Sequence, residues 1–289
     1  MPQKKITLGV TAFLDILGFG ARVLAAVNIK DVDRIASEVK RVQREFDYKP
    51  NDSSLRSVHA AYKKTVLAFS DSVIVNVPLQ SEMTELQGTF DALMSELDGL
   101  AAAQARCVNQ GVFLRGGVDL GWWYRRGATL VSKSMVRAYK AEGKADVPVI
   151  ALTQDLYTFF SKHKDRQHYS HDIEPVGRFL RPYLGGSSNV QFWYLDYITM
   201  FAEDIGWITS KAQHAKYLTA TPDEKDAIVE AGYKKNRDAW FEHHARKIEE
   251  AHQLADSAKV KAKYKWLAKY HNEIAVRFTK AGSCICTAK

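Results

Sequence analysis

The sequence predicts an α+β fold, in which a ferredoxin-like βαββαβ core precedes a C-terminal helical extension. Strand-like apolar stretches and helix-like periodic stretches follow one another in the order that this core requires. The strands are expected before Asp15, at 65–77 as a hairpin, and at 111–123, with helices at 21–46 and 83–105. Two further long helices are expected at 222–255 and 258–278. We therefore predict two domains, residues 1–200 and 201–289.

The first strand carries one carboxylate at its end. The run Phe13-Leu14-Asp15-Ile16-Leu17-Gly18-Phe19-Gly20 is apolar around Asp15 and then turns through two glycines. Glycine lets a backbone approach a ligand closely, and the first amides of the following helix can bind phosphate. The turn is therefore a candidate for holding a triphosphate beside Asp15. Glycine at a strand-to-helix turn also has ordinary steric uses.

A second carboxylate, Asp71, lies at the tip of the predicted hairpin. The strand at 65–70 leads into Asp71-Ser72, and the returning strand follows at 73–77. In a split βαβ arrangement the first strand lies centrally, beside a hairpin strand. Asp15 and Asp71 can therefore meet at one edge of the sheet.

Two acids at the ends of apolar strands favour a divalent-metal site. A buried carboxylate is costly unless a cation or several donors compensate it, and two neighbouring carboxylates repel each other. Hard oxygen ligands select Mg²⁺ or Mn²⁺, and a two-carboxylate platform suits the binding of a nucleoside triphosphate. The alternative is that each Asp only caps the turn after its strand.

The rest of the first domain supplies further candidates. Residues 122–127, Trp-Trp-Tyr-Arg-Arg-Gly, predict an exposed aromatic and basic loop that contacts a ligand or another subunit. A third helix is expected at 130–142, where Tyr139 and Glu142 share a face because they are three residues apart. A short strand is expected at 148–152.

Composition limits the choice of partners and compartment. The formal charge of +8 divides unequally, because residues 205–289 hold 16 Lys and Arg against 10 Asp and Glu, a surplus of 6. The first 204 residues carry only the remaining 2, so the core is nearly neutral, and the basic tail is either a solvated helix face or a surface that binds polyanions. No apolar run is long enough to span a membrane. Three cysteines are too few and too irregularly spaced for a zinc site or a disulfide framework, which predicts a cytoplasmic protein.

Four motifs in order resemble the catalytic domain of the class III nucleotidyl cyclases. They are Phe13-x-Asp15-Ile16-x-Gly18-Phe19, Ser70-Asp71-Ser72, Arg115-Gly116-Gly117-Val118-x-x-Gly121 and Ala138-Tyr139-x-x-Glu142. Within that family the chain is most similar to the bacterial pyrimidine cyclases of Pycsar antiphage defence. The tail motif Lys263-Tyr264-x-Trp266-Leu267-x-x-Tyr270-His271-Asn272 adds to this resemblance.

The resemblance implies a set of site residues and a dimer. Two Mn²⁺ or Mg²⁺ ions would bind to Asp15, Asp71 and the carbonyl of Ile16. The implied catalytic residues are Asp15, Asp71, Arg115 and Lys140, and the implied substrate-binding residues are Phe13, Gly18, Phe19, Ser72, Arg137, Tyr139 and Glu142. Class III relatives build each site between two chains, so a homodimer is expected. Tyr139 and Glu142 are expected to lie out of reach of Asp15 in their own chain.

Departures from the family pattern bear on the substrate. Purine-specific relatives place a base-selecting Lys where this chain has Leu67, and an Asn and an Arg where it has Val136 and Lys140. The resemblance therefore favours a pyrimidine nucleoside triphosphate, and UTP over CTP, with 3′,5′-cyclic UMP and pyrophosphate as products. Cyclic CMP is the alternative product. A non-catalytic ferredoxin-like module that binds RNA is the alternative from another functional class, and a diguanylate-type cyclase is disfavoured by the sequence of the hairpin.

Overall fold

The computed structural model describes residues 6–47, 60–127, 129–170, 174–186 and 189–288. The chain divides into two compact units. Unit 1 comprises residues 1–107 and 112–197, and unit 2 comprises 108–111 and 198–289. Each unit is described separately below. The predicted loop at 48–57 lies outside the described residues.

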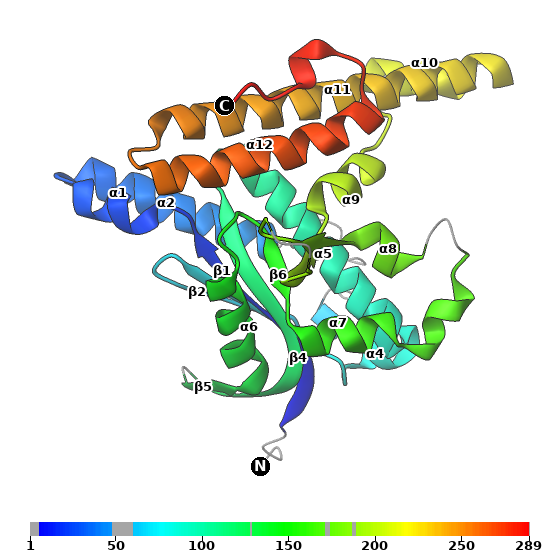
Figure 1. Ribbon diagram of the computed structural model, residues 1–289. Coiled ribbons are helices and arrows are strands. Elements are labelled where there is room, and N and C mark those ends of the chain that lie inside the picture. The colour runs from blue at the N-terminus through cyan, green and yellow to red at the C-terminus, as the bar shows by residue number, and fades with distance from the viewer. Residues whose placement is uncertain (1–5, 48–59, 128, 171–173, 187–188, 289) are drawn as a thin grey trace. The chain divides into compact units, whose positions relative to one another are not determined.

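Unit 1 is built on one mixed sheet of eight strands, most of them antiparallel (Figure 1). The order is β2-β3-β1-β4-β6-β8-β7, and β5 pairs with β4 outside this path. The pair β4–β6 is parallel. The strands are β1 (Thr7–Ile16), β2 (Thr65–Phe69), β3 (Ser72–Pro78), β4 (Leu114–Arg126), β5 (Thr129–Ser132), β6 (Ile150–Leu152), β7 (Leu180–Tyr183) and β8 (Phe192–Leu195). The central place of β1, between β3 and β4, agrees with the predicted α+β fold.

Helices cover both faces of this sheet. The helices of unit 1 are α1 (Phe19–Ala25), α2 (Ile29–Phe46), α4 (Glu82–Gln87), α5 (Thr89–Asn109, whose last two residues fall in unit 2), α6 (Lys133–Lys144), α7 (Gln154–Ser161), the 3-10 helix η1 (Lys164–His168) and α8 (Pro175–Phe179). On one face, buried β1 side chains such as Val10 and Leu14 share the core with Phe90 and Leu97 of α5. On the other face, α6 packs on β1 and β4.

Gly117 on β4 allows α6 to lie directly on the sheet. A Cβ atom at Gly117 would lie 2.1 Å from the carbonyl oxygen of Ala138, a distance that no side chain can adopt. Gly117 therefore sets the separation between α6 and β4. Gly116 faces the other side of the sheet, where a Cβ atom would lie 2.6 Å from a methyl group of Leu14.

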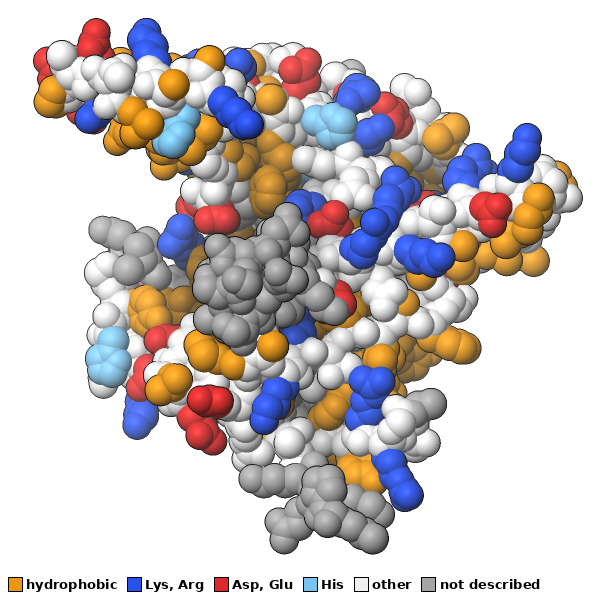
Figure 2. Space-filling view, turned by 180° about the vertical axis from the view of Figure 1, so that it is seen from behind, with side chains coloured by type: hydrophobic (Ala, Val, Ile, Leu, Met, Phe, Trp, Pro, Cys, Tyr) orange, Lys and Arg blue, Asp and Glu red, His pale blue; other side chains and the backbone are white. Residues whose placement is uncertain are grey.

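Each of two predicted helices forms as two shorter helices. The helix expected at 21–46 forms as α1 and α2, because Asn28 caps the start of α2 with its side chain. The helix expected at 83–105 forms as α4 and α5, separated at Gly88, where φ is 88°. Apolar residues of the first part are exposed rather than buried: Leu24 by 89% and Val27 by 86%. Figure 2 shows apolar side chains gathered where α1 and the start of α2 project, at the right of the view.

The predicted aromatic and basic loop at 122–127 is wrong. Residues up to Arg126 continue β4, and the backbone turns at Gly127, where φ is 58°, into β5. Trp123 is 6% exposed and pairs with Ser132, so it is a packing residue. The third helix accordingly begins at Lys133, because residues 129–132 belong to β5.

Unit 2 is helical, and both of its predicted long helices are confirmed. Its elements are most of α9 (Tyr197–Asp204, whose first residue falls in unit 1), α10 (Lys211–Thr219), α11 (Pro222–Leu254), α12 (Ala258–Phe278) and the 3-10 helix η3 (Gly282–Cys284). The helices α11 and α12 pack on each other through buried residues that include Phe241, Ile248, Leu267 and Ile274. Within the described residues, no helix is long and apolar enough to cross a membrane.

Candidate active site

The register of the sheet places Asp15 in a row of polar residues on the face that α6 partly covers. Opposite Asp15 lie Ser72 on β3 and Arg115 on β4, and Ser72 is itself opposite Phe69 on β2. Residues directly opposite in antiparallel strands share a face. Four strands therefore contribute one row at this end of the sheet.

Asp71 reaches the same end through the hairpin turn. Ser70 adopts the left-handed conformation, with φ 55°, which is uncommon for a residue other than glycine. The amide of Ile16 donates a hydrogen bond of 3.1 Å to the Asp71 carbonyl oxygen, so the turn is fastened to the end of β1. The Asp71 carboxyl group is close enough to Asp15 to raise the pKa of Asp15. The predicted meeting of two acids at one edge is thus present in this geometry.

Asp15 lies in a strongly acidic environment. Burial, together with the neighbouring carboxylates Asp71 and Glu142, raises its pKa to about 6, although Arg115 acts in the opposite direction. A guanidinium nitrogen of Arg115 lies 3.7 Å from an Asp15 carboxylate oxygen. The same guanidinium forms a close ion pair with Glu142 of α6. Two acids therefore contact one partly buried guanidinium, and a third acid, Asp71, lies beside Asp15.

The placement of Tyr139 and Glu142 corrects one expectation. Both residues lie beside the site of their own chain, because Glu142 reaches Arg115 and the Tyr139 ring meets the edge of Phe13 at a centroid distance of 5.2 Å. They do not share an environment, however. Tyr139 is 58% exposed, whereas Glu142 is 4% exposed. The sequence missed this pairing because no spacing rule connects Arg115 with a helix that folds back over it.

A second row, next to the row that contains Asp15, is apolar and partly open. It runs Leu67, Ile74, Phe13, Gly117 across β2, β3, β1 and β4. The helix α6 packs on β1 and β4, whereas Leu67 and Ile74 are only half-buried and Phe69 is 81% exposed. A planar ring can therefore reach the β2–β3 half of this face.

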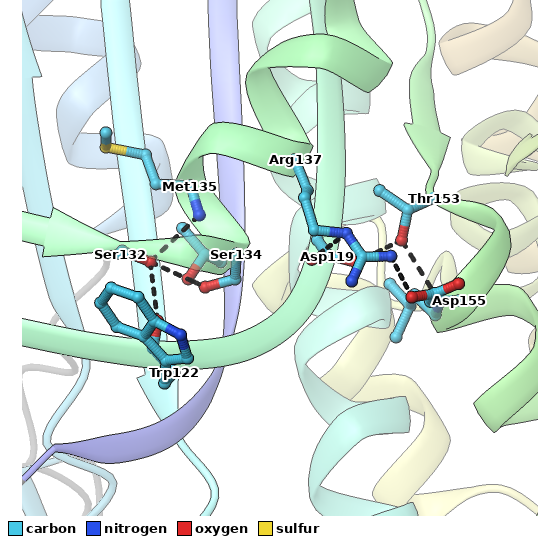
Figure 3. Close-up of polar contacts among 10 residues, drawn as sticks. Asp119, Trp122, Ser132, Ser134, Met135, Arg137, Thr153 and Asp155 are labelled. Carbon is cyan, nitrogen blue, oxygen red and sulfur yellow. Dashed lines mark hydrogen bonds and ion pairs between the residues drawn. The ribbon is translucent and has the colours of Figure 1, made fainter.

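The predicted cations Arg137 and Lys140 lie elsewhere along α6. Arg137 Nε is 3.3 Å from a carboxylate oxygen of the fully buried Asp119, and its guanidinium also pairs closely with Asp155. Figure 3 shows Arg137 between these two acids, with the Thr153 hydroxyl donating to Asp119. Lys140 lines a cavity between α6 and α7. Of the three predicted cations, Arg115 is therefore the one that contacts Asp15.

The helix α6 is anchored at its start by a small polar cluster. Ser132 caps it by accepting a hydrogen bond of 3.1 Å from the amide of Met135, and donates one to the Trp122 carbonyl (Figure 3). Ser134 bonds to Thr11 on β1 at 2.7 Å. These contacts fix the position of the helix along β1 and so the reach of Glu142, which lies two turns further on.

Gly18 and Phe19 have roles in the backbone and the core. Gly18 adopts φ 73° as the residue before α1, and a Cβ there would meet open space. Phe19 packs against the hydrophobic core. Because α1 has only seven residues, we draw no phosphate site from its first amides.

The donor set at this end of the sheet suits a hard divalent cation. Asp15 and Asp71 offer carboxylate oxygens, which Mg²⁺ and Mn²⁺ prefer, and the carboxylates outnumber the one cation that contacts them. Among the described residues there is no group of three or more His, Cys, Asp or Glu with metal-binding geometry. Asp15 and Asp71 would therefore bind metal together with backbone and substrate oxygens.

No protein-family model matches the chain, and no curated protein matches its sequence. Similar solved structures include a bacterial light-regulated adenylyl cyclase, at 11% identity and a TM-score of 0.39, which matches 67% of this chain and 92% of that one. The monomeric guanylyl cyclase domain of the RhoGC fusion protein from the aquatic fungus Blastocladiella emersonii matches at 12% identity and a TM-score of 0.41, over 66% and 95% of the two chains.

A class III adenylyl cyclase-like ATP-binding protein from Pseudomonas aeruginosa matches at 10% identity and a TM-score of 0.42, over 84% of this chain and 59% of that one. Identities and TM-scores of this size leave the activity of the present chain to be argued from its own residues.

Proposed function

We propose that this protein is a nucleotidyl cyclase that converts UTP into 3′,5′-cyclic UMP and pyrophosphate, as a second-messenger producer in antiphage defence. The observation that carries the proposal is the meeting of Asp15 and Asp71 at one edge of the sheet, fastened by the hydrogen bond from Ile16 to Asp71. The four cyclase-like motifs converge on this edge or on α6 beside it.

Asp15, Asp71 and the carbonyl of Ile16 would hold two Mn²⁺ or Mg²⁺ ions. Such ions lower the pKa of the ribose 3′-hydroxyl and neutralise charge on the departing pyrophosphate. Arg115, held by Glu142 beside Asp15, would stabilise negative charge that develops on the α-phosphate. Glu142 would act as a positioning residue, because its buried carboxylate orients the guanidinium.

Leu67 is the residue through which we assign a pyrimidine. It lies on the same face as Asp15, one row away, where an apolar side chain offers no hydrogen bond to a purine edge. Phe13, Ile74 and the exposed Tyr139 ring would pack around a single ring in the open half of this face. Cytosine presents the reversed donor and acceptor pattern, so a pocket that binds uracil rejects it strongly.

We propose that a second copy of this chain covers the open half of the face. Phe69, in the same row as Asp15, and Tyr139 of α6 are large, exposed rings, and Val136 of α6 is 48% exposed. Burying such side chains is favourable and excludes water from the site. The sheet-face RNA-binding alternative is disfavoured, because α6 covers β1 and β4, the strands that would have to stack bases.

The test compares Asp15→Asn and Asp71→Asn with the wild type for turnover of UTP and for binding of Mn²⁺ by electron paramagnetic resonance. Both variants are expected to lose turnover and to bind Mn²⁺ more weakly, while their circular dichroism is unchanged. Asp91→Asn, on α5, is the matched control. Retained turnover in either site variant would overturn the proposed metal mechanism.

A further inference from the structure

A cavity of about 280 Å³ lies in unit 1, on the side of α6 away from Phe13 and Tyr139. Its walls come from α6, the end of β6, the start of α7 and the start of β8. The polar side chains that line it are Arg137, Lys140, Lys144, Thr153, Gln154 and Gln191. Its apolar side is formed by Ala141, Ala151, Leu152 and Phe192.

The charge on this cavity is positive. The guanidinium of Arg137 is matched by Asp119 and Asp155. Lys140 and Lys144, one turn apart on α6, have no ion-pair partner within the part of the chain that the structure describes. Their two ammonium groups therefore remain to attract an anion. The start of α7, capped by Thr153, adds the positive end of a helix dipole.

The opposite wall suits a planar ring. Phe192 is buried and stacks on Tyr183 at a centroid distance of 4.5 Å, so it is fixed in place. The Gln191 side chain lies against Gly185, where a Cβ would approach it to 2.6 Å. Gln154 and Gln191 bring carboxamide groups to the rim, which can hydrogen-bond to the polar edge of a base.

We propose that this α6–α7 cavity binds a mononucleotide, with its phosphate on Lys140 and Lys144 and its base against Phe192 between the two glutamines. The volume is at the lower limit for ligand pockets, which matches a single nucleotide rather than a dinucleotide. This site is separate from the Asp15–Asp71 edge, and the proposal does not depend on the cyclase reaction.

Isothermal titration calorimetry with uridine 5′-monophosphate in EDTA tests the proposal, because it requires no turnover and no divalent metal. The wild type and Asp15→Ala are expected to bind equally. Lys144→Glu is expected to weaken binding by about tenfold or more, since it removes one charge-assisted contact and adds repulsion. Lys133→Glu, an exposed residue of the same helix outside the cavity, is the matched control and is expected to change affinity by less than about twofold.

Two further arms examine the base. Gln191→Ala is expected to weaken mononucleotide binding and to leave the binding of inorganic phosphate unchanged. Absence of binding by the wild type at millimolar nucleotide, equal losses in Lys144→Glu and Lys133→Glu, or equal affinity for inorganic phosphate and the nucleotide would each overturn the proposal. Thermal melts of the four variants establish that each is folded.

Discussion

Arg115 is the residue on which the electrostatics of the candidate site depend. It is the cation between Asp15 and Glu142, and it shares a row with both Asp15 and Ser72. Asp15 and Asp71 were predicted from their positions at strand ends, and the family resemblance added Arg115 and Glu142. The contact between Arg115 and Glu142 within one chain was not predicted, because it depends on how α6 folds back over β4.

Replacing Glu142 by Gln tests this positioning role. The amide has nearly the same shape but cannot balance the guanidinium, so Arg115 shifts toward Asp15 and competes with the metal. We expect kcat to fall by about tenfold to a hundredfold and the Mn²⁺ concentration for half-maximal activity to rise. Glu85→Gln, on α4, is the control. An unchanged Mn²⁺ dependence would show that Glu142 only packs the helix.

At the same scale, the tail motif that resembles the pyrimidine cyclases holds unit 2 together. His271 Nε2 donates to the Cys284 carbonyl at 2.8 Å, so its Nδ1 accepts from Nδ1 of His244 at 2.9 Å. The Asn272 side chain bonds both the amide and the carbonyl of Cys286. The motif therefore ties the C-terminal segment to α11 and α12.

The buried His pair predicts a loss of stability in weak acid. Burial lowers the pKa of His271 to about 4 and that of His244 well below its ordinary value. In the unfolded chain both histidines take up a proton near pH 6.5, whereas in the folded chain they stay neutral until the pH is lower. The free energy of unfolding therefore falls as the pH decreases from 6.5 to 4, and His271 contributes about 3 kcal/mol of this loss. Urea unfolding across this range measures it.

His271→Gln keeps a donor for Cys284 and removes one of the two titrating groups. It is expected to reduce the dependence of the free energy of unfolding on pH between 6.5 and 4, and His244 is expected to account for what remains. His214→Gln, on α10, serves as the comparison and should leave the slope as it is in the wild type. A slope that is the same in both variants would contradict the role of the His pair.

At the scale of elements, the sequence predicted the order of strands and helices in the core and both long helices of unit 2. The spacing of apolar residues and the positions of turn residues are local signals, so they are sufficient to predict the order and type of these elements. The break at Gly88 and the extension of β4 through residues 124–126 were not predicted. In the last case two arginines near a glycine were interpreted as a loop, whereas pairing with β5 makes them a strand.

The packing of α6 on β4 gives a prediction with an internal control. Gly117→Ala places a methyl group against the Ala138 carbonyl and should destabilise the protein by about 3 kcal/mol or more, because backbone must move. Gly143→Ala, within α6 itself, meets nothing within 4 Å and should stabilise it by up to about 1 kcal/mol. Differential scanning calorimetry compares them. Equal melting temperatures would refute the close approach of helix and strand.

At the scale of the whole molecule, the prediction concerns the half of the candidate site that α6 leaves open, which we propose a second chain covers. The exposed rings of Phe69, in the same row as Asp15, and of Tyr139, against Phe13, are expected to be covered when two chains associate. Composition could not predict this, because isolated exposed aromatics are ordinary and only the register places them on one face.

Light scattering of Phe69→Asp tests the association. A charge at a buried interface is costly, so this variant is expected to be a monomer with little turnover, whereas the wild type is expected to be a dimer. Leu86→Asp, an equally exposed apolar position on α4, is expected to remain a dimer. A monomeric wild type with full turnover would contradict the shared site.

The central claim is that the acidic edge performs cyclisation on a pyrimidine nucleotide. Its most direct test incubates the protein with equal amounts of ATP, GTP, CTP and UTP and Mn²⁺, with Asp71→Asn in parallel, and identifies the products by mass spectrometry. The account predicts that 3′,5′-cyclic UMP dominates and is absent from the variant. Dominant cyclic AMP or cyclic GMP would contradict the pyrimidine assignment, and no cyclic nucleotide from the wild type would contradict the proposed reaction.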